Sequence, residues 1–238
     1  AEAVENVLKS YGVSVLMGAD LKEIKEGTAV YTKNGEEDTL DGDAILLATG
    51  RGPNTEGLHA ERAGVELTKR GAVVTDKHLR TTAENIWAAG DVCGNLQFTY
   101  ISLDDSRIIL SDMQGDGSRT TENRGAFAYS VFMEPSFSRA GLSEKEAADK
   151  GLNYRVVRMN TDMIPKAKVL RKTTGMLKAV IDKDSGKILG AALFCPESYE
   201  IINMVKLAMD HDLDYTVLRD FIYTHPTMSE GLNDLFAL

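Results

Sequence analysis

Hydrophobic and polar positions follow different periods along the chain and predict its elements. Val4, Val7 and Leu8 are apolar at helical spacing, which predicts a short helix ended by Gly12. Residues 13–17 and 43–48 form continuous apolar runs, which are typical of strands buried on both faces. Between them, alternating segments at 21–24 and 28–32 predict two further strands, and Asn34-Gly35 is a strong hairpin signal because both residues tolerate positive φ.

The middle of the chain is predicted to hold one strand and one helix. Residues 86–89 are predicted to form a short strand that stops at Gly90-Asp91. Apolar residues between 98 and 113 predict a helix, which the sequence Gly115-Asp116-Gly117-Ser118 interrupts. That break is our predicted boundary between two regions.

From residue 126 the pattern changes to that of an α+β domain. Strands are predicted at 126–133, 154–159, 176–181 and 188–194, with a hairpin turn at 182–186. Helices are predicted at 143–150 and 198–211, followed by two short helices near the end of the chain. The helix predicted at 143–150 starts with Ser143-Glu144-Lys145-Glu146, the pattern of a capping box.

Composition narrows the class of protein. An excess of 36 Asp and Glu over 27 Lys and Arg argues against a nucleic-acid partner, which needs clustered positive charge. The two cysteines, Cys93 and Cys195, are far apart and match neither a disulfide framework nor a metal site, so we expect a reducing cytoplasmic setting and no metal. No apolar run is long enough for a membrane span, and we expect no membrane partner. Because the chain begins within a helical pattern and without Met, we expect it to be a fragment.

Two predicted strand ends are candidates for ligand contact. They are Leu47-Ala48-Thr49-Gly50 and Ala88-Ala89-Gly90-Asp91, where a glycine lets the backbone approach a ligand and an aspartate can accept a hydrogen bond from a hydroxyl. Alone, each motif is better explained as a turn, with Asp91 bonding its own backbone.

The segment Thr224-His225-Pro226-Thr227-Met228-Ser229-Glu230 is the other candidate site. Proline favours an extended conformation for the residue before it, which would present the His225 ring outward. Thr227 and Glu230 also fit a capping box, in which Glu230 would only close a helix and His225 would be a surface residue. From the residues alone, that structural explanation is slightly favoured.

Taken together, these motifs resemble the pyridine nucleotide-disulfide oxidoreductases, the family of glutathione reductase and dihydrolipoamide dehydrogenase. The resemblance implies an α/β remnant of nicotinamide- and FAD-binding domains, followed by an α+β interface domain with an antiparallel sheet. The implied boundaries are 1–45 for the nicotinamide domain, 46–118 for the FAD domain and 119–238 for the dimerisation domain. FAD contacts would come from residues at the two strand ends and at the start of the following helix: Thr49, Gly50, Arg51, Gly90, Asp91, Gln97, Phe98 and Thr99.

The resemblance also assigns a role to the last motif, whose family form is His-Pro-Thr-x-Ser-Glu. His225 would be the acid/base for the dithiol of the partner subunit in a homodimer, and Glu230 would orient it. In the intact enzyme, NAD(P)H would reduce FAD and the dithiol would reduce a small-molecule or protein disulfide or an oxidant. The chain contains neither the Cys-x-x-x-x-Cys pair nor a Gly-x-Gly-x-x-Gly loop, so we expect no turnover from it alone.

Two other classes of protein remain as alternatives. One is a non-catalytic dimerisation module that keeps the fold without the chemistry. The other is a monooxygenase-like or NADH-oxidase-like flavoprotein, which the His-Pro-Thr-x-Ser-Glu ending disfavours because such enzymes have no dithiol to protonate.

Overall fold

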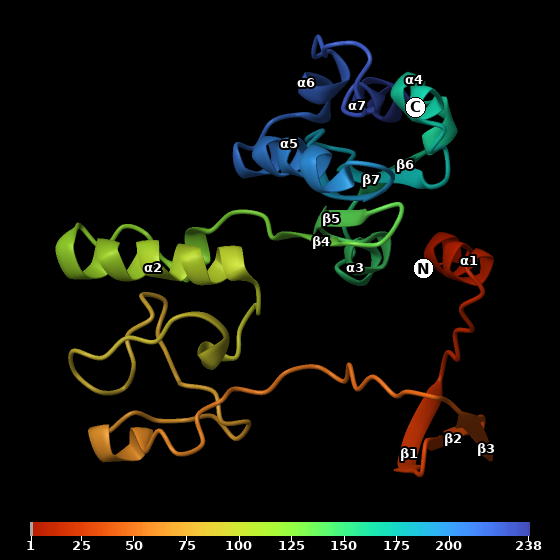
Figure 1. The fold of residues 1–238 in the computed structure, drawn as a ribbon. Helices are drawn as coiled ribbons and strands as arrows, with labels where there is room; N and C mark the ends of the chain where they lie inside the picture. Colours follow the sequence, from red (N-terminus) through yellow and green to blue (C-terminus); the bar gives the residue numbers. More distant parts are fainter. Residues whose placement is uncertain (1) are drawn as a thin grey trace. The chain divides into compact units, whose positions relative to one another are not determined.

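The computed structural model describes residues 2–238, whose contacts divide the chain into two compact units (Figure 1). The first unit comprises the residues up to Asp76 together with Arg80–Asp104. The second comprises Lys77–Leu79 and Asp105–Leu238. Each unit is described by itself below.

The first unit opens with a helix and a three-stranded sheet. Helix α1 (Glu2–Ser10) buries Val7, in agreement with its predicted apolar spacing. Strands β1 (Ala19–Lys25), β2 (Thr28–Lys33) and β3 (Glu36–Asp41) pair antiparallel in chain order. The predicted turn is confirmed, because Asn34 and Gly35 join β2 to β3 with φ of 54° and 85°.

Three predicted strands of this unit were wrong. Residues 13–17 and 43–48 are irregular and largely exposed, with Leu46 at 89% and Met17 at 67% exposure. A buried strand needs neighbouring strands and covering helices, and no described segment pairs with either run. Residues 86–89 make a single bridge, from Trp87 to Arg80, rather than a ladder.

The rest of the first unit is mostly irregular chain with short helical turns. These are η1 (Ala60–Ala63) and η2 (Gly90–Cys93), packed around a small apolar cluster of Ala60, Val65 and Val73. The predicted helix at 98–113 is confirmed as α2 (Thr99–Gln114), which begins in the first unit and ends in the second.

The second unit is built on a five-stranded antiparallel sheet in the order β4-β5-β8-β7-β6. Strands β6 (Tyr154–Asn160), β7 (Met176–Asp182) and β8 (Ile188–Phe194) lie where the pattern predicted them. The strand predicted at 126–133 is shorter, as β4 (Ala128–Val131), because residues 132–135 turn the chain into an unpredicted strand, β5 (Phe137–Gly141).

The two faces of this sheet are covered differently. Helices α5 (Ser198–Asp210) and α7 (Gly231–Ala237) cover the apolar face, where the fully buried residues include Leu177, Leu193 and Leu232. Helix α3 (Glu144–Asp149) covers the other face, and Figure 1 shows α5 and α3 on opposite sides of the strands. Two short helices, α4 (Pro165–Leu170) and α6 (Tyr215–Arg219), complete the unit.

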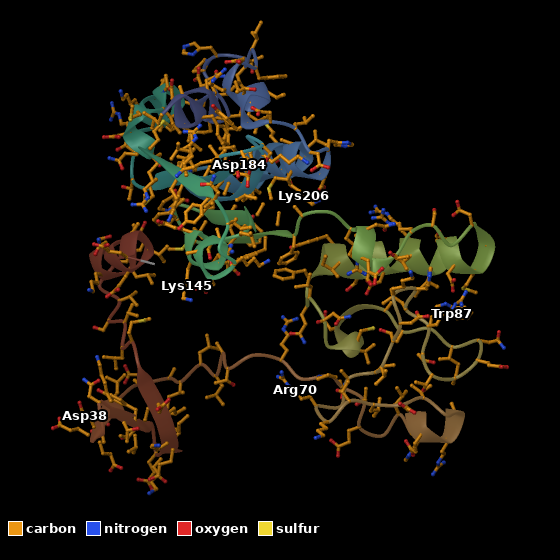
Figure 2. The ribbon with its side chains drawn as sticks, turned by 180° about the vertical axis from the view of Figure 1, so that it is seen from behind. Asp38, Arg70, Trp87, Lys145, Asp184 and Lys206 are labelled. Atoms are coloured by element: carbon orange, nitrogen blue, oxygen red, sulfur yellow. The ribbon has the colours of Figure 1, made fainter. Side chains whose placement is uncertain are left out.

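Helix α3 is tied to its face of the sheet by charged side chains. Its carboxylates pair with cations on three strands: Glu144 with Arg158 and Lys178, and Glu146 with Arg139. Lys145 projects from the outer side of α3, and Asp184 lies in the β7–β8 turn (Figure 2). Arg139, Lys178 and Arg158 occupy one row across the paired strands, so all three lie on the face of the sheet that α3 covers.

The predicted capping box of α3 is confirmed. The Ser143 hydroxyl accepts from the Glu146 amide at 3.1 Å, and the Glu146 carboxylate accepts from the Ser143 amide at 2.7 Å. Hydrogen bonding from Ser143, and after it from Arg139, lowers the pKa of Glu146 from 4.5 to about 2.

This shift predicts a pH-dependent effect of Glu146→Gln. A carboxyl whose pKa is lower in the folded state stabilises the fold above its unfolded pKa and loses that contribution as the pH falls through the folded pKa. We expect the variant to be less stable than the wild type at pH 7, with the difference closing between pH 4.5 and about 2. Urea unfolding at a series of pH values measures this difference, and a difference that is constant over that range contradicts the assignment.

Candidate active site and cofactor-binding loops

The segment that carries His225 runs over the surface between α6 and α7. Phe221, Ile222 and Thr224 are exposed, and the His225 side chain is 68% exposed. The His225-Pro226 peptide is cis. Its exposure shows that the imidazole is presented outward, as the sequence predicted.

Glu230 contacts the histidine ring directly. His225 Nδ1 and Glu230 Oε2 are 2.7 Å apart, and the glutamate side chain is only 15% exposed. The other carboxylate oxygen, Oε1, accepts from the Thr227 amide at 3.0 Å, while the Thr227 hydroxyl accepts from the Glu230 amide at 3.3 Å. Glu230 thus shares reciprocal hydrogen bonds with Thr227 and contacts His225 at the same time, so the two explanations weighed for the sequence do not exclude each other.

This geometry sets the proton arrangement of the imidazole. A carboxylate beside Nδ1 favours a proton on that nitrogen and leaves the lone pair on Nε2. No hydrogen bond to Nε2 occurs among residues 2–238. The ring can therefore accept a proton at Nε2 and return it.

Core packing holds the glutamate in place. Met228 is 1% exposed, and the helix that follows Glu230 buries Leu232, Leu235 and Phe236. At Gly231 a Cβ atom would lie 2.8 Å from Ile164 Cδ1, so the absence of a side chain lets the start of α7 approach α4 closely. The orientation of Glu230 is thus fixed by the core rather than by the exposed loop.

Three predicted cofactor residues, Thr49, Gly50 and Arg51, lie at the first predicted strand end. Of these, only Arg51 contacts another predicted cofactor residue, Asp91. Thr49, Gly50 and Arg51 lie in exposed irregular chain. Arg51 Nη1 is 3.5 Å from Asp91 Oδ2, with both side chains substantially exposed. The structure therefore brings the two predicted strand ends together through this ion pair.

The second strand end lies against helix α2. Gly90 is buried with φ of 76°, and a Cβ atom there would lie 2.8 Å from the Ser102 hydroxyl oxygen. Gln97, Phe98 and Thr99 form the entry to α2, where the amides of Ile101 and Ser102 bond to the Phe98 carbonyl. The closeness of Ser102 to Gly90 was not predicted, and the sequence carries no signal for it.

These residues fit part of a flavin dinucleotide site. Gly90 brings the backbone within contact of α2, and Asp91 offers a half-exposed carboxylate that can accept from a hydroxyl. The first turn of α2 contains no acidic residue, so its positive end is not neutralised from within the helix. The fit is limited to Gly90, Asp91 and the start of α2, because Thr49 and Gly50 lie in exposed irregular chain and form no binding loop of their own.

The cysteines and the other histidines belong to neither site. Cys195 is fully buried, and desolvation, followed by Glu197, raises its pKa to about 12, which leaves an unreactive thiol. Cys93 is buried in η2. His59 and His211 are exposed, whereas His78 is largely buried with Nδ1 3.8 Å from Asp112 Oδ1. Within the described part of the chain, no three His, Cys, Asp or Glu residues are grouped to hold a metal ion.

The fold and these sites correspond to one family. Residues 1–106 match the pyridine nucleotide-disulphide oxidoreductase family, and residues 127–236 match the dimerisation domain of the same family. The chain belongs to the pyridine nucleotide-disulphide oxidoreductases.

Individual relatives agree with this family. The probable pyridine nucleotide-disulfide oxidoreductase RclA of Escherichia coli is 47% identical over all of this chain and 54% of its own length. Mercuric reductase of Staphylococcus aureus is 33% identical over 98% of the chain and 43% of its own length. A solved structure of the HOCl-induced flavoprotein disulfide reductase RclA from E. coli superposes with a TM-score of 0.91 at 46% identity, covering all of this chain and 55% of that one.

The chain spans about half the length of the curated relatives it matches. The predicted fold class is confirmed by the superposition, and the family's members use FAD and NAD(P)H, as the sequence predicted. No helix among residues 2–238 is long and apolar enough to cross a membrane.

Proposed function

We propose that the chain is the C-terminal part of an FAD-dependent NAD(P)H:disulfide oxidoreductase that works as a cytoplasmic homodimer. In this proposal the chain supplies FAD contacts, the dimer interface and the acid/base His225 for the dithiol of the partner subunit. The observation that carries it is the contact between His225 Nδ1 and Glu230 Oε2 at 2.7 Å, with the rest of the ring exposed. The substrate is a small-molecule or protein disulfide, or an oxidant.

The proposed task of His225 is to move a proton at Nε2. A thiol becomes a nucleophile only as the thiolate, so a base that titrates near neutral pH must take up its proton and later return it to the leaving thiolate. Glu230 offsets the charge that forms on the ring and prevents the ring from turning. Exposure of the ring suits a base that serves a group on another subunit.

The proposed role of the first unit is to hold the flavin, which supplies two-electron transfer when it is bound. Asp91 would accept from a hydroxyl of the cofactor chain, and Gln97, Phe98 and Thr99 would place the start of α2 beside the ring system. Thr49, Gly50, Arg51 and Gly90 would line the approach. The chain alone is proposed to be inactive, because its two cysteines are both buried and far apart in sequence.

Subunit mixing in the full-length protein tests this function. One subunit carries His225→Ala and the other lacks its redox cysteines, and dimers containing both are isolated with two affinity tags. Each variant dimer alone is expected to reduce a small aromatic disulfide very poorly. The mixed dimer is expected to recover about half of the wild-type turnover, because one of its two symmetric sites has both intact groups.

The controls are dimers of each variant mixed only with itself, which must stay inactive. A mixed dimer with no recovered activity shows that His225 does not act across the interface. Wild-type activity in the His225→Ala dimer removes the proposed catalytic role of His225 altogether.

A further inference from the structure

Asn233, on helix α7, holds the chain segment that leads to His225. Its Nδ2 atom lies within hydrogen-bond distance of three backbone carbonyls: 3.2 Å from that of Leu218, 2.6 Å from that of Arg219 and 2.9 Å from that of Phe221. An amide carries only two hydrogens, so one of them is shared. These carbonyls belong to the last turn of α6 and to the start of the surface segment, where a helix leaves its carbonyls without intrahelical partners.

The surface segment has few other anchors. Residues 221–227 belong to no helix or strand. None of them forms a backbone–backbone hydrogen bond with another described residue. Tyr223 is half-buried against the core and donates its hydroxyl to the Leu218 carbonyl at 3.2 Å. Thr227 donates its hydroxyl to the Thr224 carbonyl at 2.8 Å. Side chains, rather than a backbone ladder, therefore define the path of this segment.

Helix α7 reaches both ends of the segment. Glu230, just before the helix, contacts His225 and the Thr227 amide, and Asn233 contacts the Phe221 carbonyl. The helix itself is rigidly placed, because Leu232 and Leu235 are completely buried. One buried element thus fixes the orientation of the imidazole through Glu230 and the course of the chain before it through Asn233.

We infer that Asn233 is a positioning residue for His225. It touches no reacting atom, and its effect on turnover passes through the placement of the histidine. This inference rests on the proposed function of His225. It adds a residue that the His-Pro-Thr-x-Ser-Glu motif does not contain.

A double-mutant cycle in the full-length protein tests it, with Asn233→Ala made in the wild type and in the His225→Ala background. A displaced reacting group lowers the rate steeply, so we expect Asn233→Ala to lower kcat for disulfide reduction by about 10-fold with a smaller change in KM. In the His225→Ala background we expect no further loss, because the histidine that Asn233 positions is already absent. The limb of the kcat–pH profile that His225→Ala abolishes is expected to shift in Asn233→Ala.

Asn153→Ala is the matched control. It removes an asparagine amide hydrogen bond of 2.9 Å, to Asp184, from the same unit but far along the chain from His225. It is expected to leave kcat and the pH profile unchanged.

The outcomes separate the two proposals. If His225→Ala has wild-type activity, the proposed function fails. If His225→Ala is impaired but Asn233→Ala is not, or if Asn233→Ala causes an equal loss in both backgrounds, only the positioning role is overturned. Should Asn233→Ala fail to fold, the same cycle with Asn233→Asp, which keeps the shape of the side chain without its donors, decides the question by the same criteria.

Discussion

Glu230→Gln in the full-length protein is expected to lower kcat for disulfide reduction by about 10³-fold while the fold is retained. The substitution keeps the size of the side chain and one oxygen, which can still accept from the Thr227 amide now 3.0 Å from Oε1. The other terminal group becomes an NH2 that faces His225 Nδ1. The hydrogen bond from the Thr227 amide can therefore survive, while the group facing His225 Nδ1 changes from a hydrogen-bond acceptor to a donor.

The loss follows from the tautomer of the imidazole. An NH2 group donates, so Nδ1 must become the acceptor and the ring proton must move to Nε2. Nε2 then no longer has a lone pair to take a proton from a thiol. The carboxylate that offsets the charge of the protonated ring is also lost, so both contributions of Glu230 disappear in one substitution.

The measurement is the pH dependence of kcat, with the melting temperature recorded for each variant. Asp234→Asn is the control: it removes one carboxylate charge from α7, where Asp234 is exposed and forms no hydrogen bond or ion pair with His225, and it is expected to behave as the wild type. A Glu230→Gln protein with near wild-type kcat contradicts the orienting role, whereas a low melting temperature assigns the effect to the lost cap.

Local signals predicted the elements that local interactions define. Asn34-Gly35 marks the β2–β3 turn, Ser143 and Glu146 mark the start of α3, and both were confirmed. The runs at 13–17 and 43–48 were wrong because an apolar run reports a need for burial, not the presence of the strands that provide it. Strand β5 has the sequence Phe-Ser-Arg-Ala-Gly, with few strand-forming side chains, and exists because β4 and β8 pair with it on both sides.

The same distinction applies to the candidate site. The His225–Glu230 contact spans five residues and could be anticipated from a short motif. Asn233 could not, because an asparagine on a helix is usually a surface residue and its three carbonyl partners are identified only when α6 and α7 are packed together. The role of Cys195 as a core residue likewise depends on its complete burial, which its position in the sequence does not reveal.

Gly175→Ala is expected to destabilise the second unit by about 4 kcal/mol or more, the largest stability effect we predict. Gly175 precedes β7 with φ of 122°, a conformation that L side chains rarely adopt. A Cβ atom there would lie 1.9 Å from the Phe194 carbonyl oxygen and 3.1 Å from the Thr161 hydroxyl oxygen. Both neighbouring residues are buried in the core. The amide of the fully buried Thr161 also bonds to the Gly175 carbonyl at 3.1 Å.

The clash cannot be relieved by moving a flexible side chain, because the nearest atom is backbone of β8. Relief requires separating the paired ends of β7 and β8, and β8 also packs against α5. Gly151→Ala is the matched control: its φ of 65° is also positive but no atom lies within 4 Å of the added Cβ, so only the backbone strain of about 1–2 kcal/mol is expected. Urea unfolding of the full-length variants, followed by circular dichroism, compares the two. Equal destabilisation by both substitutions contradicts the steric argument, because strain at positive φ is then the whole effect.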